Sequence, residues 1–169
     1  GYYTCGLTNA GTAYCWGYNG SGQIGDSTSG TNRTSPTAVS GGLTFTSISA
    51  ANSGSSLNSH TCGITNTGAA YCWGDNTYGA IGNGTSGWGT IRTSPTAVSG
   101  GLTFTSISGG GYYTCGLTNA GAAYCWGTNG SGQLGDGTTT TRTTPTPVGG
   151  GLTFTSITAG YSTTCGLAS

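Results

Sequence analysis

The chain has 169 residues, of which 36 are glycine and none is methionine, so few large apolar side chains are available to build a core. Its net charge is zero, and its charged residues are three acids and three arginines: Asp26, Asp75, Asp136, Arg33, Arg92 and Arg142. Nucleic-acid binding depends mainly on clustered cations that neutralise phosphates, so arginines this widely separated argue against a nucleic-acid partner.

The chain repeats itself with a period of about fifty residues. Each copy contains, in order, LTFTSIS, TCG[LI]TN, a glycine turn, AYCWG, a Gly-rich stretch and R-T-[ST]-P-T. The first cysteines of the copies are Cys5, Cys62, Cys115 and Cys165, at intervals of 57, 53 and 50 residues. A period of this size is typical of a solenoid, a propeller or an array. We expect one repeat domain over 1–169, with repeats at 1–51, 52–108 and 109–158 and the start of a fourth at 159–169.

The first element of the chain is a hairpin that carries two cysteines ten residues apart. In its turn, Asn9-Ala10-Gly11, glycine stands where a three-residue loop needs a left-handed residue. If Leu7 faces Ala13, then Cys5 faces Cys15, and directly opposed residues of an antiparallel pair lie close enough for a disulfide. The same arithmetic applies to each copy, so we predict three disulfides: Cys5–Cys15, Cys62–Cys72 and Cys115–Cys125.

Two other interpretations of the cysteines are open. Thiolates are good zinc ligands, but the chain has no C-x-x-C and only one histidine, His60, so metal binding is the weaker hypothesis. Reduced, buried cysteines in a cytosolic protein are the second alternative. Three facing pairs favour an oxidising compartment, and we therefore expect an extracellular or cell-surface protein. Cys165 is left without a partner and is expected to be unpaired or intermolecular.

The remaining strand signals complete a set of four per repeat. The LTFTSIS segments at 43–49, 102–108 and 152–158 are rich in β-branched and aromatic residues and follow a glycine pair. A weaker strand surrounds a proline at 36–39, 95–98 and 145–148, and proline confines it to a sheet edge. Four antiparallel strands per repeat predict an all-β fold of tandem propeller-type blades, about three in number, either open or completed by neighbouring chains.

Blades pack face against face, so both sides of the middle strands should be buried. Trp16 should therefore pack against a neighbouring sheet together with Tyr14, with an aromatic ring lying over Gly6 on the opposite strand. The same packing is expected for Trp73 and Trp126, although a sugar-stacking role is the alternative. Trp88 stands in an insertion that only the second repeat has, so it is the candidate contact residue.

The run HTCGITNTGAAYCWGDNTYGAIGNGT, with NGSGQIGDST and NGSGQLGDGT in the other copies, resembles the repeat of the regulator of chromosome condensation family. The resemblance covers essentially the whole chain and implies β-propeller blades, commonly seven to a ring. It does not fix a function, since the family includes a nuclear nucleotide-exchange factor, bacterial inhibitors of β-lactamase and secreted proteins without assigned roles. The paired cysteines resemble the secreted bacterial branch. Two positions of the second copy depart from the others: Ala80 stands where they have Gln23 and Gln133, and His60 stands where they have Tyr3, Tyr113 and Thr163. A position exchanged so freely is not expected to be catalytic.

The sequence argues against catalysis. A nucleophilic site needs a histidine, an acid and an activated serine or cysteine in one place, whereas His60 is solitary, glutamate is absent and the paired cysteines are expected to be oxidised. Asp26 and Asp136 lie in GQ[IL]GD turns, where aspartate usually bonds backbone amides. No Asp-rich loop suited to calcium occurs. We expect no enzymatic activity, no cofactor and no resident metal.

Glycosylation is the modification that the sequence suggests. Four asparagines begin N-x-[ST] sequons: Asn19, Asn32, Asn83 and Asn129. The alternative is that NGS serves simply as a turn, because a chain rich in Asn, Gly, Ser and Thr produces sequons by chance. The segment TTTTRTTPT at 138–146 also has the composition of O-glycosylated tracts.

The repeat count suggests how the chain works. Propellers close with roughly four to eight blades, so about three blades leave apolar faces that seek copies of the chain or the rest of a longer propeller. The chain opens at Gly1 without a start methionine, which is expected of a mature, processed or partial sequence. No apolar run is long enough to span a membrane. Our first hypothesis is an extracellular structural protein that assembles end to end into a fibre or surface appendage. The alternative is a secreted binding module that recognises a protein or glycan through rim loops, chiefly 83–91.

Overall fold

The computed structural model describes residues 2–51, 54 and 58–169, and every regular element in them is a β-strand. The strands are β1 (Tyr3–Leu7), β2 (Ala13–Gly17), β3 (Arg33–Ala38), β4 (Phe45–Ala50), β5 (His60–Thr65), β6 (Ala70–Asp75), β7 (Ile91–Ala97), β8 (Phe104–Gly109), β9 (Tyr113–Thr118), β10 (Ala123–Gly127), β11 (Arg142–Pro147), β12 (Phe154–Ala159) and β13 (Thr164–Ala168).

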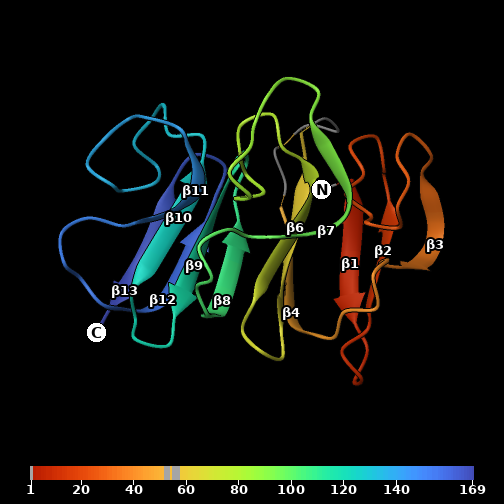
Figure 1. Cartoon of the computed structure of the whole chain (residues 1–169), viewed down its shortest axis with the longest axis horizontal. Helices are drawn as coiled ribbons and strands as arrows, with labels where there is room; N and C mark the ends of the chain where they lie inside the picture. The colour runs from red at the N-terminus through yellow and green to blue at the C-terminus, as the bar shows by residue number, and fades with distance from the viewer. Residues whose placement is uncertain (1, 52–53, 55–57) are drawn as a thin grey trace.

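The strands form four antiparallel sheets that stand side by side like the blades of a propeller (Figure 1). Two sheets have four strands, β4-β5-β6-β7 and β8-β9-β10-β11, while the first is β1-β2-β3 and the last is β12-β13. The predicted all-β, blade-type fold with about three blades is confirmed. Each proline strand lies at a sheet edge, as its missing N–H requires.

The structural blades are offset by one strand from the sequence repeats. The strand that ends the first repeat, β4, pairs with β5 of the second, and β8 likewise pairs with β9. The repeat boundary that we set after residue 51 adjoins residues 52 and 53, which lie outside the described residues. Each blade therefore combines the end of one copy with most of the next, which ties successive copies into a continuous fold.

The cysteine hairpins have the register that their spacing indicates. Cys5 is opposite Cys15, with 4.1 Å between the Cα atoms, and the two are joined by a disulfide. The structure also contains the disulfides Cys62–Cys72 and Cys115–Cys125. The turn glycine Gly11 has φ +79°, and a Cβ there would lie 2.7 Å from the carbonyl oxygen of Phe45. Glycine is thus needed both for the turn and for close approach of the next blade.

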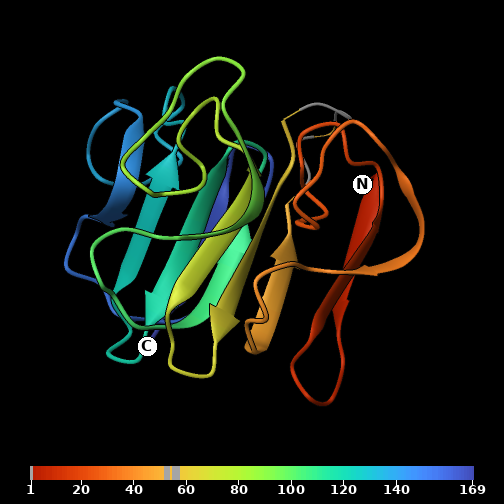
Figure 2. The same ribbon diagram turned by 45° about the vertical axis from the view of Figure 1, so that its right-hand side comes forward.

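Most of the core lies between blades rather than within them. One cluster joins Tyr3 and Cys15 of the first sheet, and Ile24 of the loop after β2, to Phe45 and Trp73 of the second sheet. Figure 2 shows the faces of the successive sheets turned toward one another. Every residue of β5 is buried, whereas most of β13 is exposed. The residues of a strand are therefore fully buried only where its sheet has a neighbouring sheet on both faces.

The tryptophans follow this rule. Trp73 and Trp126 are completely buried, and packing rather than sugar stacking is their structural role. Trp16, in the first sheet, is only half-buried. The tryptophan of the AYCWG motif is therefore a core residue in the two four-stranded blades and a partly exposed residue in the first sheet.

One detail of the predicted packing is wrong. We expected Tyr14 and Trp16 to provide the aromatic ring over Gly6, but the ring over the equivalent Gly63 belongs to Phe45, on the preceding strand of the same blade. A Cβ at Gly63 would lie 2.6 Å from the Phe45 ring, whereas a Cβ at Gly6 would have no heavy atom within 4 Å. The glycine leaves room for the phenylalanine of the innermost strand, a contact that the hairpin alone could not indicate.

The buried disulfide of the central blade should contribute measurably to stability. Replacing both Cys62 and Cys72 by alanine is expected to lower the free energy of unfolding by about 2–3 kcal/mol, because the closed loop restricts the unfolded chain. Urea unfolding followed by tryptophan fluorescence would measure the loss. The matched change at Cys5 and Cys15 should cost less, because Cys5 is only half-buried. Equal unfolding midpoints for the parent and the central variant would contradict this role.

Candidate functional site

Two regions of the molecule offer candidate sites: the joints between blades and the rim of loops at one end. At each joint a loop of one blade lies on the indole of the next. Trp73 donates from Nε1 to the carbonyl oxygen of Gln23 at 3.0 Å, and Trp126 donates to that of Ala80 at 2.9 Å. Because the acceptor is a backbone carbonyl, alanine can replace glutamine in the second repeat without loss of the bond.

Glycine in the same loop permits the close approach of the indole. Gly25 and Gly82 have φ of +79° and +76°, and a Cβ at either would lie 2.5 Å from Nε1 of the tryptophan. A threonine hydroxyl completes the joint, since Thr61 donates to the Gln23 carbonyl at 2.8 Å. The joint is thus a repeated structural contact, which leaves no space for a ligand.

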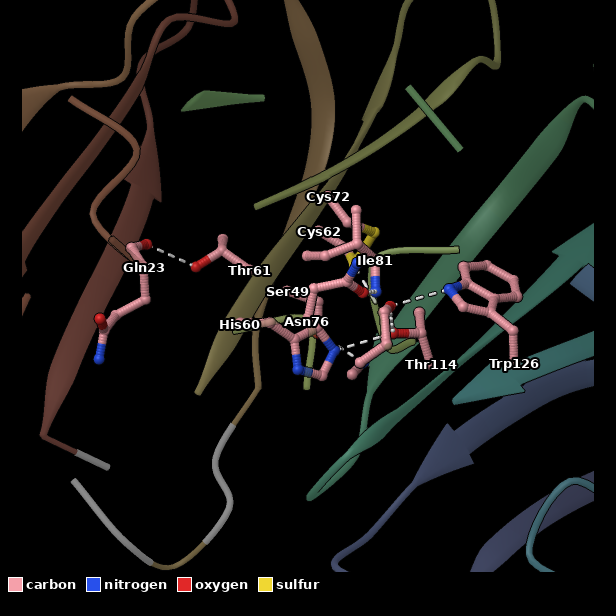
Figure 3. The surroundings of a disulfide bond; sticks show 12 residues. Gln23, Ser49, His60, Thr61, Cys62, Cys72, Asn76, Ile81, Thr114 and Trp126 are labelled. Atoms are coloured by element: carbon pink, nitrogen blue, oxygen red, sulfur yellow. Dashed lines mark hydrogen bonds between the residues drawn. A yellow bond between two sulfur atoms is a disulfide. The ribbon is translucent and has the colours of Figure 1, made fainter. Parts of the chain in front are cut away.

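His60 lies inside the second of these joints. Its Nε2 is 2.8 Å from the hydroxyl oxygen of Thr114, beside the Cys62–Cys72 disulfide (Figure 3). Its Nδ1 is buried and has no partner among the described residues. Burial lowers the pKa of His60 to about 4, so the imidazole is neutral at physiological pH. A fully buried, neutral side chain in a packed joint is not accessible to a substrate.

The rim consists of the loops 18–32, 76–90 and 128–141, which lie at the end opposite the hairpin turns (Figure 1). A buried asparagine closes each loop. Asn19 donates from Nδ2 to the carbonyl oxygen of Thr28 at 3.2 Å and accepts from the backbone N–H of Ile24 at 3.2 Å. Asn76 and Asn129 make the equivalent bonds. These side chains hold the loops in a fixed shape.

This geometry corrects two of the four glycosylation candidates. Asn19 and Asn129 are completely buried, and the nitrogen that would carry a sugar already donates hydrogen bonds inside the loop. A glycan there would remove those bonds and could not fit, so the turn interpretation holds at these two places. Asn32 is exposed and Asn83 is partly exposed, and both remain candidates.

Two of the three aspartates form ion pairs that join a rim loop to the strand after it. Asp26 pairs with Arg33 and Asp136 with Arg142, in each case between a carboxylate oxygen and Nε of the arginine. Hydrogen bonds from Thr138, and next from Arg142, lower the pKa of Asp136 to about 2. Partial desolvation of the carboxylate acts in the opposite direction but is outweighed. The two carboxylates therefore serve the loops rather than a substrate. Among the described residues, no group of three His, Cys, Asp or Glu could hold a metal ion.

The second loop, 76–90, projects an aromatic side chain. Trp88 is 89% exposed, at the tip of the insertion that the sequence singles out. The loop is anchored by a bond from the Gly87 N–H to the Thr77 carbonyl at 3.2 Å, and the Thr90 hydroxyl donates to the Gly87 carbonyl at 2.7 Å. An exposed indole on an anchored loop has the character of a contact residue.

Three tyrosines from three different repeats meet beside the rim loops, and we did not predict this cluster. Tyr78 belongs to the loop 76–90, whereas Tyr112 and Tyr161 lie in the turns that follow β8 and β12; we count these turns with the rim. Tyr78 and Tyr112 have ring centroids 5.3 Å apart, and Tyr112 and Tyr161 are 5.8 Å apart, both pairs edge to face. The hydrogen bond with Tyr112 raises the pKa of Tyr161. The rings border an open groove of about 320 Å³ whose other walls include Thr128 and Gln133. The available signal was that tyrosine at position 78 replaces the serine of the first and third copies, and that tyrosine at position 161 replaces Gly1, Asn58 and Gly111 of the earlier copies.

Two further predictions concern the unpaired cysteine and membrane-spanning segments. Cys165 is exposed and has no disulfide partner in the described part of the chain. The described residues include no helix long and apolar enough to cross a membrane.

Comparison with known proteins gives consistent matches. Two family models, both described as the regulator of chromosome condensation (RCC1) repeat, match residues 120–167 and residues 1–23, 58–80 and 104–133. The RCC1 domain-containing protein RUG3 of Arabidopsis thaliana is 30% identical over 81% of this chain and 31% of its own length.

Solved structures agree with these matches. Prp20p from Saccharomyces cerevisiae has a TM-score of 0.83 at 19% identity, covering 99% of this chain and 42% of its own, which shows the shared fold. The ectodomain of the Physcomitrella patens receptor kinase CR4 has a TM-score of 0.59 at 29% identity, over 99% of this chain and 33% of its own. The chain thus spans less than half the length of these three relatives.

The buried histidine predicts an acid-sensitive joint. Because folding holds the pKa of His60 near 4, below its usual 6.5, the unfolded chain binds the proton first. The stability due to neutral His60 should be complete above about pH 6.5 and be lost as the pH falls to 4, by roughly 3 kcal/mol. His60→Tyr, which installs the residue of the other copies, should remove this part of the acid sensitivity. Identical pH profiles of urea stability for the two proteins would refute the assignment.

Proposed function

The chain belongs to the regulator of chromosome condensation repeat family, and from that premise we propose that it is an extracellular binding module that recognises a protein partner through its rim. The single observation that carries the proposal is the gathering of exposed aromatic side chains at one end of an otherwise repetitive molecule. Trp88 is 89% exposed, Tyr161 is 56% exposed and Tyr78 is 39% exposed.

The composition of this rim supports a recognition role. Tyrosine and tryptophan provide large contact area at little cost in conformational entropy, while serine, threonine, glycine and asparagine provide adaptable hydrogen bonds. The loop that carries Tyr78 and Trp88 is held by the buried Asn76, so it is shaped before a partner arrives. Joints between the blades differ little from one another, whereas the rim loops differ in their side chains, as at the equivalent positions Ser21, Tyr78 and Ser131. A partner would distinguish this chain from its relatives at the rim.

The relatives support a protein as the partner. Prp20p was solved together with a study of its binding to Gsp1p and histones, and Kap60 was solved bound to Prp20. The partner of the present chain should differ from a histone in charge, because Asp26 and Asp136 are neutralised by the arginines that begin the following strands. We therefore propose a partner with an uncharged contact surface.

An extracellular location is supported by two observations. Three intrachain disulfides join neighbouring strands, and such bonds persist in oxidising compartments. The CR4 relative, which is 29% identical, is a receptor ectodomain. We propose a non-enzymatic role because His60 is buried in a joint and the carboxylates of Asp26 and Asp136 are engaged in their loops. Glycans at Asn32 and Asn83 fit the same location.

Site-directed crosslinking would test the rim as a binding surface. A photoreactive benzoylphenylalanine in place of Trp88 should crosslink to a distinct protein in the cell-surface fraction of the source organism. The same residue in place of Asn9, on the hairpin turn at the other end, is the matched control and should give no adduct. Adducts of the same mass at both positions, or at Asn9 alone, would refute recognition by the rim.

We propose self-association as a second function, because one face of the last sheet offers a groove that matches a side chain of the first. The groove measures about 420 Å³ and is lined by Leu134, Gly135, Phe154 and Gly166. Gly135 is equivalent to Gly25 and Gly82, which lie against an indole, but its Cβ would meet only Val148. Trp16 of a second copy would supply that indole, and repetition of the contact would produce a fibre.

Sedimentation velocity would test this second function. The parent protein should form larger species as concentration rises, and Trp16→Ala should remain monomeric because the indole no longer fills the groove. Trp88→Ala is the control and should associate like the parent. Circular dichroism would verify that each variant is folded. A parent protein that sediments as a monomer at every concentration would exclude association through these faces.

A further inference from the structure

We propose that the tyrosine groove, defined by Tyr78, Tyr112 and Tyr161, binds an uncharged, proline-rich segment in the polyproline II conformation. This inference rests on the proposed function, since it names the kind of segment that the rim recognises. It concerns a site separate from Trp88, which does not line the groove.

The groove is built on anchored backbone. Tyr112 follows Gly111, whose N–H donates to the carbonyl oxygens of Gly160 and Tyr161 at 3.1 and 3.2 Å. The carbonyl of Tyr112 in turn accepts from the N–H of Thr128 at 3.0 Å. A Cβ at Gly111 would lie 2.6 Å from the carbonyl oxygen of Tyr161, so the two turns are in direct contact. The rings are therefore positioned before binding, which reduces the entropy that a ligand must overcome.

The groove is not a by-product of the repeat. Tyr78 stands where the other copies have Ser21 and Ser131, and Tyr161 stands where the preceding copy has Gly111. Blade packing does not require these rings, because the joints between blades are formed by other side chains, such as Trp73 and Trp126. A chain that otherwise copies itself closely thus departs from its own pattern at two positions that meet in space. Such a departure indicates a function at this place.

The dimensions of the groove match a polyproline II helix. Successive rings lie 5.3 and 5.8 Å apart and meet at 73° and 75°, which makes a continuous row of alternating ring faces and edges. A polyproline II helix rises about 9 Å per turn of three residues, so one turn is comparable in length with the three-ring row. Aromatic-lined grooves are the usual receptors for this conformation, because pyrrolidine rings pack on the aromatic side chains.

The chemistry of the groove also matches. A polyproline II segment has no internal hydrogen bonds, so its carbonyl oxygens need donors from the receptor. The groove supplies hydroxyls from its tyrosines, Thr128 and Ser162 and an amide from Gln133. None of its lining residues is charged, which favours a neutral segment over an acidic or basic one. A pyranose would require a flat open ring face, whereas the edge-to-face rings divide this surface.

Binding of a labelled decaproline peptide, measured by fluorescence polarisation with the folded chain, tests the inference. The parent protein should bind decaproline at least tenfold more tightly than a ten-residue Gly-Ser peptide. Tyr161→Ala should weaken decaproline binding about tenfold or more, the loss expected when a central aromatic contact is removed. Tyr2→Ala is the matched control, because Tyr2 is also exposed and is the counterpart of Tyr112 in the first repeat. It should change affinity less than twofold.

Three outcomes would overturn the inference. They are equal affinity for decaproline and the Gly-Ser peptide, equal weakening by Tyr161→Ala and Tyr2→Ala, and binding of cellohexaose in preference to decaproline. Circular dichroism of each variant separates loss of binding from loss of folding. If decaproline fails to bind while position 88 still crosslinks to a protein, the tyrosine groove is not a proline site but the rim remains a binding surface. If both fail, the proposed function fails as well.

Discussion

The structure depends on one contact, in which a glycine-containing loop of one blade lies on the tryptophan indole of the next. The sheets are built from small residues, so neither face of a blade can bury its own apolar atoms. Trp73 and Trp126 become fully buried only because Gly25 and Gly82 allow a loop backbone to reach them. Both glycines have positive φ, where other residues are strained. Stability therefore resides in pairs of blades rather than in single sheets, as expected of a repeat protein.

This constraint also explains where the chain is free to vary. Residues of the joint recur from copy to copy, and the exchange of Gln23 for Ala80 is harmless because the contact uses the backbone carbonyl. Rim loops are closed by buried asparagines and also contain buried residues such as Ile24 and Ile81, whereas other positions of the same loops are exposed. Tyr78 and Trp88 occupy exposed positions of the loop 76–90, and the other two rings of the tyrosine groove lie in the turns that follow β8 and β12. Recognition can thus change at the rim without disturbing the joints.

The sequence predicts the local features of the fold well and the contacts between copies poorly. Cysteine spacing and Gly11 define the hairpin register, because a turn and two opposed side chains are close in sequence. The ring over Gly63 comes from Phe45, on a different strand, and no local pattern assigns it. Sequons at Asn19 and Asn129 look accessible in sequence because burial of the amide depends on the folded loop. The tyrosine groove could not be predicted because its rings come from three repeats.

The joint can be tested by comparing two alanine substitutions at equivalent glycines. Gly82 and Gly135 have φ of +76° and +67°, so the backbone strain of alanine is similar, but only a Cβ at Gly82 would meet the indole of Trp126, at 2.5 Å. Urea unfolding followed by tryptophan fluorescence should show that Gly82→Ala lowers the free energy of unfolding by about 1–3 kcal/mol more than Gly135→Ala. Equal losses for the two variants would contradict the claim that the glycine–indole contact holds the blades together.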